Sequence, residues 1–290
     1  MAGKSVLIAG ATGYLGQHLI REAKRQGYRV RALARNSDKL AHLDKFIDDL
    51  FVGEVTNPYS LNGICDKIDY VISALGITRQ KDGFTYMDVD YQGNKNLLHY
   101  ALSAGVSRFE YVSVYNAHLM SKLKIIEAKE KFVRELIASG LDYIIVRPTG
   151  FFSDMLEFLR MANKGTVYLF GDGRFGINPI HGQDLAERCV AALGGTEQEI
   201  LVGGPKTFTH NQIAELAFET LNRKPKISYI PLWLVRAYLP VMRLFTSVKT
   251  YGPIEFMMTA LSMDGVAPPY GKEKLKVFFE DNALASDSRQ

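Results

Sequence analysis

The sequence predicts an α/β fold, with a doubly wound parallel sheet in the first half and a smaller, mainly helical lobe in the second. Two observations predict the sheet: short apolar runs alternate with helical patterns, and each run is apolar at nearly every position, as in strands covered on both faces. A third is a glycine-rich turn directly after the first run. The 290 residues are 47% hydrophobic and 23% charged, which suits one large domain with a lobe.

Five strands and three helices are predicted in the first 150 residues. The strands are the β-branched runs 6–9, 29–34, 70–74, 109–114 and 143–147. The helices are the segments 14–26, 85–103 and 122–139 that alternate with them. Gly27, Gly105 and Gly140 follow these helices, and glycine is the residue that most easily takes the left-handed conformation that ends a helix.

Helical patterns dominate after residue 150. Helices are predicted at 152–162, 184–193, 211–221, 232–245 and 254–262, with short strands at 200–202 and 227–230. The predicted organisation is a nucleotide-binding domain over 1–150, a substrate lobe over 151–282 and a disordered tail over 283–290. The chain could return to the sheet around 175–205. We expect the lobe over the carboxyl ends of the strands, where ligands of such sheets bind.

Composition excludes several classes of protein. The net charge is +4 and the basic residues are spread along the chain, so no nucleic-acid partner is expected. Cys65 and Cys189 lie far apart, and the six histidines lack ligand spacing, so neither a disulfide framework nor a metal site is expected. No signal peptide precedes the first strand, and no run of about 18 apolar residues occurs. A cytoplasmic location is therefore predicted.

The glycine-rich turn is the sequence Gly10-Ala11-Thr12-Gly13-Tyr14-Leu15-Gly16, followed by an amphipathic helix. Gly10 allows the tight turn, Gly13 lets the backbone approach a pyrophosphate, and Gly16 lets helix and strand pack closely. The helix N-terminus presents N–H groups to the anion. A Rossmann-type dinucleotide site follows, although a plain strand-to-helix turn is the alternative. The predicted cofactor contacts here are Gly10, Thr12, Gly13, Tyr14, Leu15 and Gly16.

The end of the second strand favours NADP(H) over NAD(H). An NAD site usually carries an acidic residue there, which accepts hydrogen bonds from the ribose 2′-hydroxyl. This chain has Arg35, Asn36 and Ser37 instead. The Arg35 guanidinium can pair with a 2′-phosphate in bidentate fashion, and Asn36 and Ser37 add donors. The alternative is a solvated arginine at a strand end.

Five segments resemble the atypical short-chain dehydrogenases/reductases: 10–16, 71–76, 91–98, 104–109 and 146–152. The most similar branch contains NmrA-like proteins, isoflavone-reductase-like enzymes and divinyl-chlorophyllide reductases. Similarity to the last group continues through 128–132, 170–173, 179–186, 203–205 and 224–226. The resemblance implies cofactor contacts beyond the glycine turn. These are Val55 near the adenine, Ala74, Leu75 and Gly76 along the adenosine and ribose, and Ser113 and Pro148 beside the nicotinamide.

Lys129 lies within the apolar stripe of the helix predicted at 122–139. At 100° per residue the stripe around it consists of Ile125, Ile126, Phe132, Val133, Leu136 and Ile137. A buried lysine needs a partner, which a cofactor ribose or a reacting carbonyl would supply. The alternative is a snorkelling lysine whose stem covers apolar surface.

The resemblance implies a catalytic role for the same lysine. Family members use a Tyr-x-x-x-Lys pair, and Lys129 matches the lysine, whereas Ile125 stands at the tyrosine position. Some reductases of this branch also lack the tyrosine and use the lysine directly. Lys129 could stabilise charge that develops on the substrate or help deliver a proton. Tyr115, just after the fifth strand, is a candidate substitute acid or a packing residue.

Two functions remain open. The first is an NADP(H)-dependent oxidoreductase that reduces a C=C or C=O group of an apolar small molecule. The second is a non-catalytic NADP(H)-binding sensor or assembly factor, as in NmrA-like relatives. Ile125 favours the second, and the inward position of Lys129 favours the first.

The segment 231–245 carries a hypothesis of its own. It is apolar, with Trp233, Tyr238 and Phe245, and it includes Arg236 and Arg243. Such a helix could make a peripheral contact with a membrane or cover an apolar substrate pocket. The alternative, and the commoner case, is the core-facing helix of the lobe. About 15 residues are too few to span a bilayer.

Overall fold

The computed structural model describes residues 3–78, 80 and 83–287, which form two compact units. Unit 1 comprises Met1–Arg147 and Leu185–Leu201, and unit 2 comprises Pro148–Asp184 and Val202–Gln290. The chain leaves unit 1 at the end of one sheet strand and returns to it for a helix and a further strand. No described helix combines the length and the apolar character that a membrane span requires.

Unit 1 is built around a parallel sheet whose strand order is β3-β2-β1-β4-β5-β6-β9. The strands are β1 (Ser5–Ala9), β2 (Arg29–Ala34), β3 (Asp49–Val52), β4 (Tyr70–Ser73), β5 (Arg108–Val112), β6 (Tyr143–Pro148) and β9 (Glu199–Val202). Ile8 pairs with Ala32 of β2 on one side and with Ile72 of β4 on the other. The strand order reverses at β1, which is the point where ligands bind in such sheets. The predicted doubly wound sheet is confirmed.

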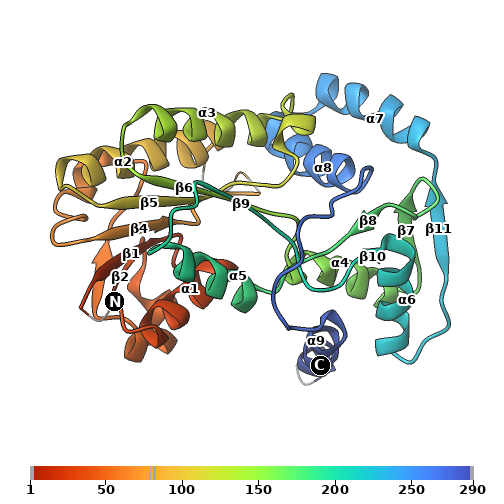
Figure 1. The fold of residues 1–290 in the computed structure, drawn as a ribbon. Coiled ribbons are helices and arrows are strands. Elements are labelled where there is room, and N and C mark those ends of the chain that lie inside the picture. The colour runs from red at the N-terminus through yellow and green to blue at the C-terminus, as the bar shows by residue number, and fades with distance from the viewer. Residues whose placement is uncertain (1–2, 79, 81–82, 288–290) are drawn as a thin grey trace. The chain divides into compact units, whose positions relative to one another are not determined.

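Helices cover both faces of this sheet (Figure 1). They are α1 (Tyr14–Arg25), α2 (Asn94–Ser103), α3 (Lys124–Ala138) and α5 (Gly182–Ala192), with short helical turns η1 (Ser37–Phe46), η2 (Pro58–Leu61), η3 (Met87–Gly93) and η4 (Ala117–Met120). Side chains of β5 alternate between the two faces. Tyr111 packs edge-on against Phe132 of α3, whereas Glu110 points to the opposite face and interacts with Cys189 of α5.

The helix ends follow the sequence signals. Gly27, Gly105 and Gly140 all have positive φ, as predicted for residues that follow a helix. Arg108 secures the end of α5: its Nη1 donates to the carbonyl oxygens of Ala192, Leu193 and Gly195 at 3.3, 3.1 and 2.6 Å. These contacts add a side-chain donor to the carbonyl groups at and just after the helix end. They also bind the returning segment to strand β5.

Unit 2 is mainly helical, as predicted. Its elements are α4 (Phe152–Asn163), β7 (Val167–Phe170), β8 (Gly176–Ile177), β10 (Phe208–Thr209), α6 (His210–Thr220), β11 (Ile227–Ile230), α7 (Leu232–Phe245), α8 (Val248–Ala260) and α9 (Leu275–Asp287). Its main core joins α4, α6 and α9 through Phe158, Phe218 and Phe279. Elsewhere in this unit the buried side-chain amide of Asn178 donates to the carbonyl oxygens of Gly204 and Ala267, so its amide nitrogen is hydrogen-bonded.

Several elements differ from the expectations. Strand β3 was not predicted, because it is four residues long and only partly buried, so its apolar signal is weak. The predicted helix 85–103 begins with the π-helical turn η3. Helix α9 continues to Asp287, into the segment predicted as a tail, and residues 288–290 lie outside the described part of the chain. Ile137, placed in the apolar stripe of α3, is 48% exposed because it lies at the edge of the stripe near the helix end.

Candidate nucleotide-binding and catalytic site

The glycine turn has the geometry of a phosphate-binding loop. Gly10 has φ +82°, and a Cβ atom on it would lie 2.7 Å from the carbonyl oxygen of Ala74. A Cβ atom on Gly16 would overlap the carbonyl oxygen of Gly10, so helix α1 can approach the turn only with glycine there. Helix α1 starts at Tyr14, and its N-cap Gly13 provides no side-chain cap. No side chain of the N-cap residue therefore competes with an anion for the first N–H groups of the helix.

The remaining residues of the turn divide into exposed and buried positions. Thr12 is exposed and Tyr14 is half-buried, whereas Leu15 is buried. The structure brings the turn against the end of β4, since the close approach of Gly10 to Ala74 links the two. Leu75 follows Ala74 and is half-buried, and Gly76 is exposed. The residues predicted along one side of the cofactor are thus contiguous in space with the glycine turn.

Lys129 lies at this same edge of the sheet. A Cβ atom on Gly76 would be 2.8 Å from the Lys129 Nζ and 2.7 Å from Oδ1 of Asp90. The Lys129 side chain is 14% exposed, which does not fit a snorkelling lysine. Glycine at position 76 therefore leaves the space that this ammonium group occupies beside the strand end.

Asp90, on η3, is the partner that the buried lysine requires. Its Oδ1 lies 3.0 Å from the Lys129 Nζ, and its Oδ2 accepts a hydrogen bond from the backbone N–H of Ile77 at 3.2 Å. Lys129 also donates to the hydroxyl of Tyr111 at 3.5 Å. An ammonium group has three donors, and these contacts use two of them within the described part of the chain. The third can serve a ligand.

Burial and charge determine the protonation of this cluster. Burial raises the pKa of Asp90, and the Lys129 charge opposes that shift. Burial also raises the pKa of the Tyr111 hydroxyl to about 12, so this hydroxyl stays neutral. Burial acts to lower the pKa of Lys129, but Tyr111 and Asp90 outweigh it and hold that pKa above its usual value. Lys129 is consequently an ammonium ion at neutral pH.

Ser113, at the end of β5, belongs to a second polar cluster. Its hydroxyl donates to Glu130 at 2.8 Å and accepts from Arg147 at 3.3 Å. Arg147 donates to both carboxylate oxygens of Glu130, at 2.7 and 3.0 Å, and to Glu199 at 2.7 Å. Because Glu130 follows Lys129 in α3, this cluster fixes the helix against β5 and β6. Pro148, which ends β6, is buried.

The positions of Tyr115 and Ile125 test whether a tyrosine could serve as the acid that donates a proton to the substrate. Tyr115 is half-buried, and within the described residues no hydrogen bond joins it to Lys129. Ile125 is buried in the first turn of α3, so the position of the family tyrosine contributes to the core. Tyr111 is the hydroxyl that the structure brings to Lys129.

Arg35, predicted to bind a 2′-phosphate, is exposed after β2. Its Nη1 lies 3.5 Å from Oε2 of Glu54. The side-chain oxygen of Asn36 accepts the backbone N–H of Asp38, so its amide nitrogen is the group that can face a ligand. Ser37 is exposed. Val55 follows Glu54 and is buried, and a Cβ atom on Gly93 would lie 2.9 Å from it.

Two histidines outside this cluster, His181 and His210, serve packing, and no metal site accompanies them in the described part of the chain. Within the described residues no group of three or more His, Cys, Asp or Glu side chains could hold a metal ion. His181 packs against Phe152 and Phe278, and its Nδ1 accepts the backbone N–H of Gln183. Burial lowers the pKa of His210 to about 4, so it is a neutral core residue.

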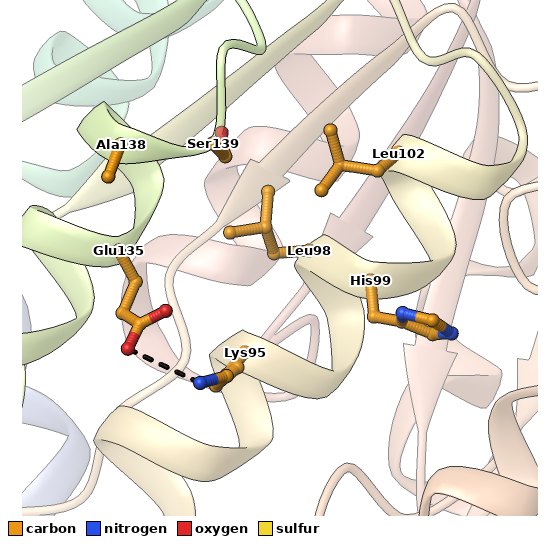
Figure 2. Close-up of a pocket in the computed structure, with 7 residues that line it drawn as sticks. All are labelled: Lys95, Leu98, His99, Leu102, Glu135, Ala138 and Ser139. Atoms are coloured by element: carbon orange, nitrogen blue, oxygen red, sulfur yellow. Dashed lines mark hydrogen bonds and ion pairs between the residues drawn. The ribbon is translucent and has the colours of Figure 1, made fainter.

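A shallow pocket of about 260 Å³ lies between α2 and α3 (Figure 2). Lys95 and Glu135 form an ion pair across it at 3.3 Å. Leu98 and Leu102 supply the apolar part of its wall. Because it is lined by the outer helices and not by strand ends, it is distinct from the site at the glycine turn.

The model of the NAD(P)H-binding family matches residues 10–195. This range includes the glycine turn, the end of β4 and Lys129. The chain belongs to the NAD(P)H-binding family. As a family member it has the predicted Rossmann-type fold, and the resemblance to atypical short-chain dehydrogenases/reductases is confirmed. The family is named for binding NAD(P)H, so the prediction of a nicotinamide nucleotide as cofactor is confirmed.

Two curated relatives with similar sequences have different named functions. The chain is 30% identical over 236 residues to photosystem II assembly factor Ycf39 of Guillardia theta, covering 80% of this chain and 74% of the relative. It is 29% identical over 320 residues to the chloroplastic divinyl chlorophyllide a 8-vinyl-reductase of Cucumis sativus, covering 95% of this chain and 75% of the relative. One relative is thus named as a reductase and the other as an assembly factor.

A solved structure shares the fold. An NADPH-dependent quinone oxidoreductase of Escherichia coli, solved in complex with NADPH, superposes with a TM-score of 0.76 at 17% identity. The match covers 96% of this chain and 99% of that chain.

Sequence reasoning missed Asp90 and Tyr111. Tyr111 could have been found from strand alternation, which places it on the same face of the sheet as Phe109. Asp90 and Asp88 alternate with the apolar residues Met87, Val89 and Tyr91, so the local sequence does not single out Asp90. The buried lysine itself indicated that such an acid should be sought.

Proposed function

We propose that this protein is an NADPH-dependent reductase that acts on a C=C or C=O group of an apolar small molecule. The observation that carries the proposal is the buried ammonium group of Lys129 at the end of β4, next to the glycine turn. An ion pair that serves only to stabilise the fold could lie anywhere in the core. This lysine lies instead at the carboxyl edge of the sheet, where ligands of such folds bind. A perturbed, buried cation there is a candidate for charge stabilisation.

The bound nucleotide would supply the hydride. Lys129 would donate a hydrogen bond to the substrate oxygen or conjugated system on which negative charge develops. Because its pKa is held above the usual value, the proton that completes the reduction would come from water. Asp90 would keep Lys129 protonated and hold its side chain in place through the 3.0 Å contact. Tyr111, which accepts from Lys129, would fix the direction of the remaining donor. Asp90 and Tyr111 are therefore positioning residues in this proposal.

The preference for NADPH would rest on Arg35. The 3.5 Å separation from Glu54 is long for a charge-assisted hydrogen bond, and both side chains are accessible to solvent. A 2′-phosphate could therefore recruit the guanidinium group from its present partner. The amide nitrogen of Asn36 would add a donor on the same loop.

The substrate class follows from the relatives' names as a proposal. A vinyl-reductase and a quinone oxidoreductase are each named for a conjugated, largely apolar substrate. Suitable probes are divinyl chlorophyllide and a soluble quinone, with oxidation of NADPH followed by its absorbance. The expected result is turnover of at least one probe by the wild-type chain.

Lys129→Met tests the role of the lysine in this turnover. Loss of an ammonium group that stabilises charge in the transition state should lower kcat by about 100-fold or more, with NADPH still bound. Lys124→Met is the matched control, because Lys124 lies on the same helix, is 56% exposed and pairs with Glu127. Equal activity of Lys129→Met and wild type would contradict the proposed role.

A non-catalytic NADP(H)-binding assembly factor is the second candidate. Two observations favour it: the buried Ile125 at the tyrosine position, and the similarity to a relative named as an assembly factor. Nucleotide binding without turnover of either probe, together with capture of a protein partner only when NADPH is present, would support this function over the reductase.

A further inference from the structure

Helix α7 has two apolar faces. Its inner stripe contains the buried Val235 and Met242, and Val235 packs in a small core with Phe170 and Met258 of α8. Its outer face carries six exposed large apolar side chains: Trp233, Leu234, Tyr238, Val241, Leu244 and Phe245. At 100° per residue these six span a sector of about 140°, which runs from Tyr238 beside the inner stripe to Leu244 and Trp233 on the opposite side of the helix. Leu244 and Phe245 are 80% and 82% exposed.

A helix that is apolar over most of its circumference is normally buried, so the exposed apolar face needs a partner. The charge of the segment around this face indicates what kind of partner it binds. Residues 231–254 contain three basic residues, Arg236, Arg243 and Lys249, and no acidic residue. Arg236 and Arg243 are seven positions apart and share one flank of the helix. The next acid, Glu255, is buried and is paired with Arg243.

We infer that the outer face of α7 binds the surface of an anionic lipid bilayer. The apolar side chains would enter the boundary between headgroups and acyl chains, with Trp233 and Tyr238 at the depth such rings favour. Arg236 and Lys249 would contact the lipid phosphates. A second copy of the chain fits this face less well, since two faces flanked only by cations would repel each other. The inference is independent of the reductase proposal.

The single tryptophan of the chain makes the binding directly measurable, because Trp233 lies on the proposed surface. Full-length protein is titrated with vesicles of phosphatidylglycerol and phosphatidylcholine, and with vesicles of phosphatidylcholine alone. We expect a blue shift of the tryptophan emission and co-sedimentation with the anionic vesicles, both weakened by salt. Acyl chains that carry bromine should quench Trp233 in the wild-type chain, which requires no variant.

The variant Leu244→Glu/Phe245→Glu tests the face itself. Loss of two apolar side chains and gain of two negative charges should weaken vesicle binding by more than about tenfold. The matched control is Tyr59→Glu/Leu284→Glu, which changes one exposed aromatic and one exposed leucine elsewhere. This control should bind as the wild type does.

Three results would overturn the inference. They are failure of wild-type protein to bind anionic vesicles, equal binding by Leu244→Glu/Phe245→Glu, and absence of quenching by the brominated chains. A concentration-dependent dimer that this variant abolishes, without vesicle binding by the wild type, would assign the face to a second copy instead. Because every readout is lipid binding, failure here leaves turnover and its Lys129 dependence untouched.

Discussion

Lys129 of α3 and Asp90 of η3 form a buried ion pair with 3.0 Å between Nζ and Oδ1. The two residues come from helices that meet over the end of β4, and Gly76 leaves the space between them and the strand. The pair explains how a lysine is tolerated in the apolar stripe of α3, and it places a permanent cation beside the glycine turn.

The first prediction concerns the stability of this pair. Lys129→Met or Asp90→Asn leaves one charged group buried without its partner, so each should lower the free energy of unfolding by about 3–5 kcal/mol. The double variant removes both charges and should cost much less than the sum of the single changes. Urea unfolding of the four proteins gives the coupling energy. Additive single effects would show that the two side chains do not interact.

The second prediction concerns Gly76. In Gly76→Ala the added Cβ would lie within 3.0 Å of both Asp90 and Lys129, so the pair must shift. We expect destabilisation of about 1–3 kcal/mol and weaker nucleotide binding in calorimetry. Gly265→Ala is the control, since the nearest atom to its added Cβ would be 3.8 Å away. Unchanged nucleotide binding in Gly76→Ala would place the nucleotide away from this strand end.

The third prediction concerns the buried acid Glu110. Burial raises its pKa from 4.5 to about 8, although the Cys189 thiol and the charges of Arg188 and Arg108 oppose the shift. The folded chain therefore binds this proton more tightly than the unfolded chain does. The contribution is present at low pH and is lost as pH rises towards 8, by about 1.4 kcal/mol per pH unit.

The clean interval for this test is pH 6.5 to 8. His210, with a pKa lowered from 6.5 to about 4, has the opposite dependence below pH 6.5 and would mask the effect there. Glu110→Gln cannot titrate, so its stability should decline less than that of wild type across the interval. Glu157→Gln, at an exposed ion pair with Arg160, should follow the wild type. Parallel curves for wild type and Glu110→Gln would mean that Glu110 is ionised throughout.

The fourth prediction concerns Arg35. Arg35→Gln should weaken NADPH binding by about 10- to 100-fold, the range expected for one lost charge-assisted contact, and leave NADH binding unchanged. Glu54→Gln releases the guanidinium group from its present partner and should strengthen NADPH binding. Arg174→Gln, an 82% exposed position, is the control. Equal losses for both nucleotides in Arg35→Gln would assign the residue to the fold and not to the 2′-phosphate.

Features that depend on local sequence were predictable. The fully buried strands β1 and β4 are continuous apolar runs, and the turn conformation of Gly10 follows from glycine spacing. Strand β3 was not predicted because it is short and half-exposed, so its hydrophobic pattern resembles that of a loop. The partner of Lys129 was not predicted for a different reason. Asp90 is distant in sequence and reaches the lysine only because a π-helical turn and α3 pack together.

The most direct test of the central claim is a calorimetric titration of the full chain with NADPH and, separately, with NADH. The glycine turn and Arg35 together predict that NADPH binds at least about tenfold more tightly than NADH. That result would support the NADPH-dependent site on which the reductase proposal depends. Absence of binding by both nucleotides, or tighter binding of NADH, would contradict it.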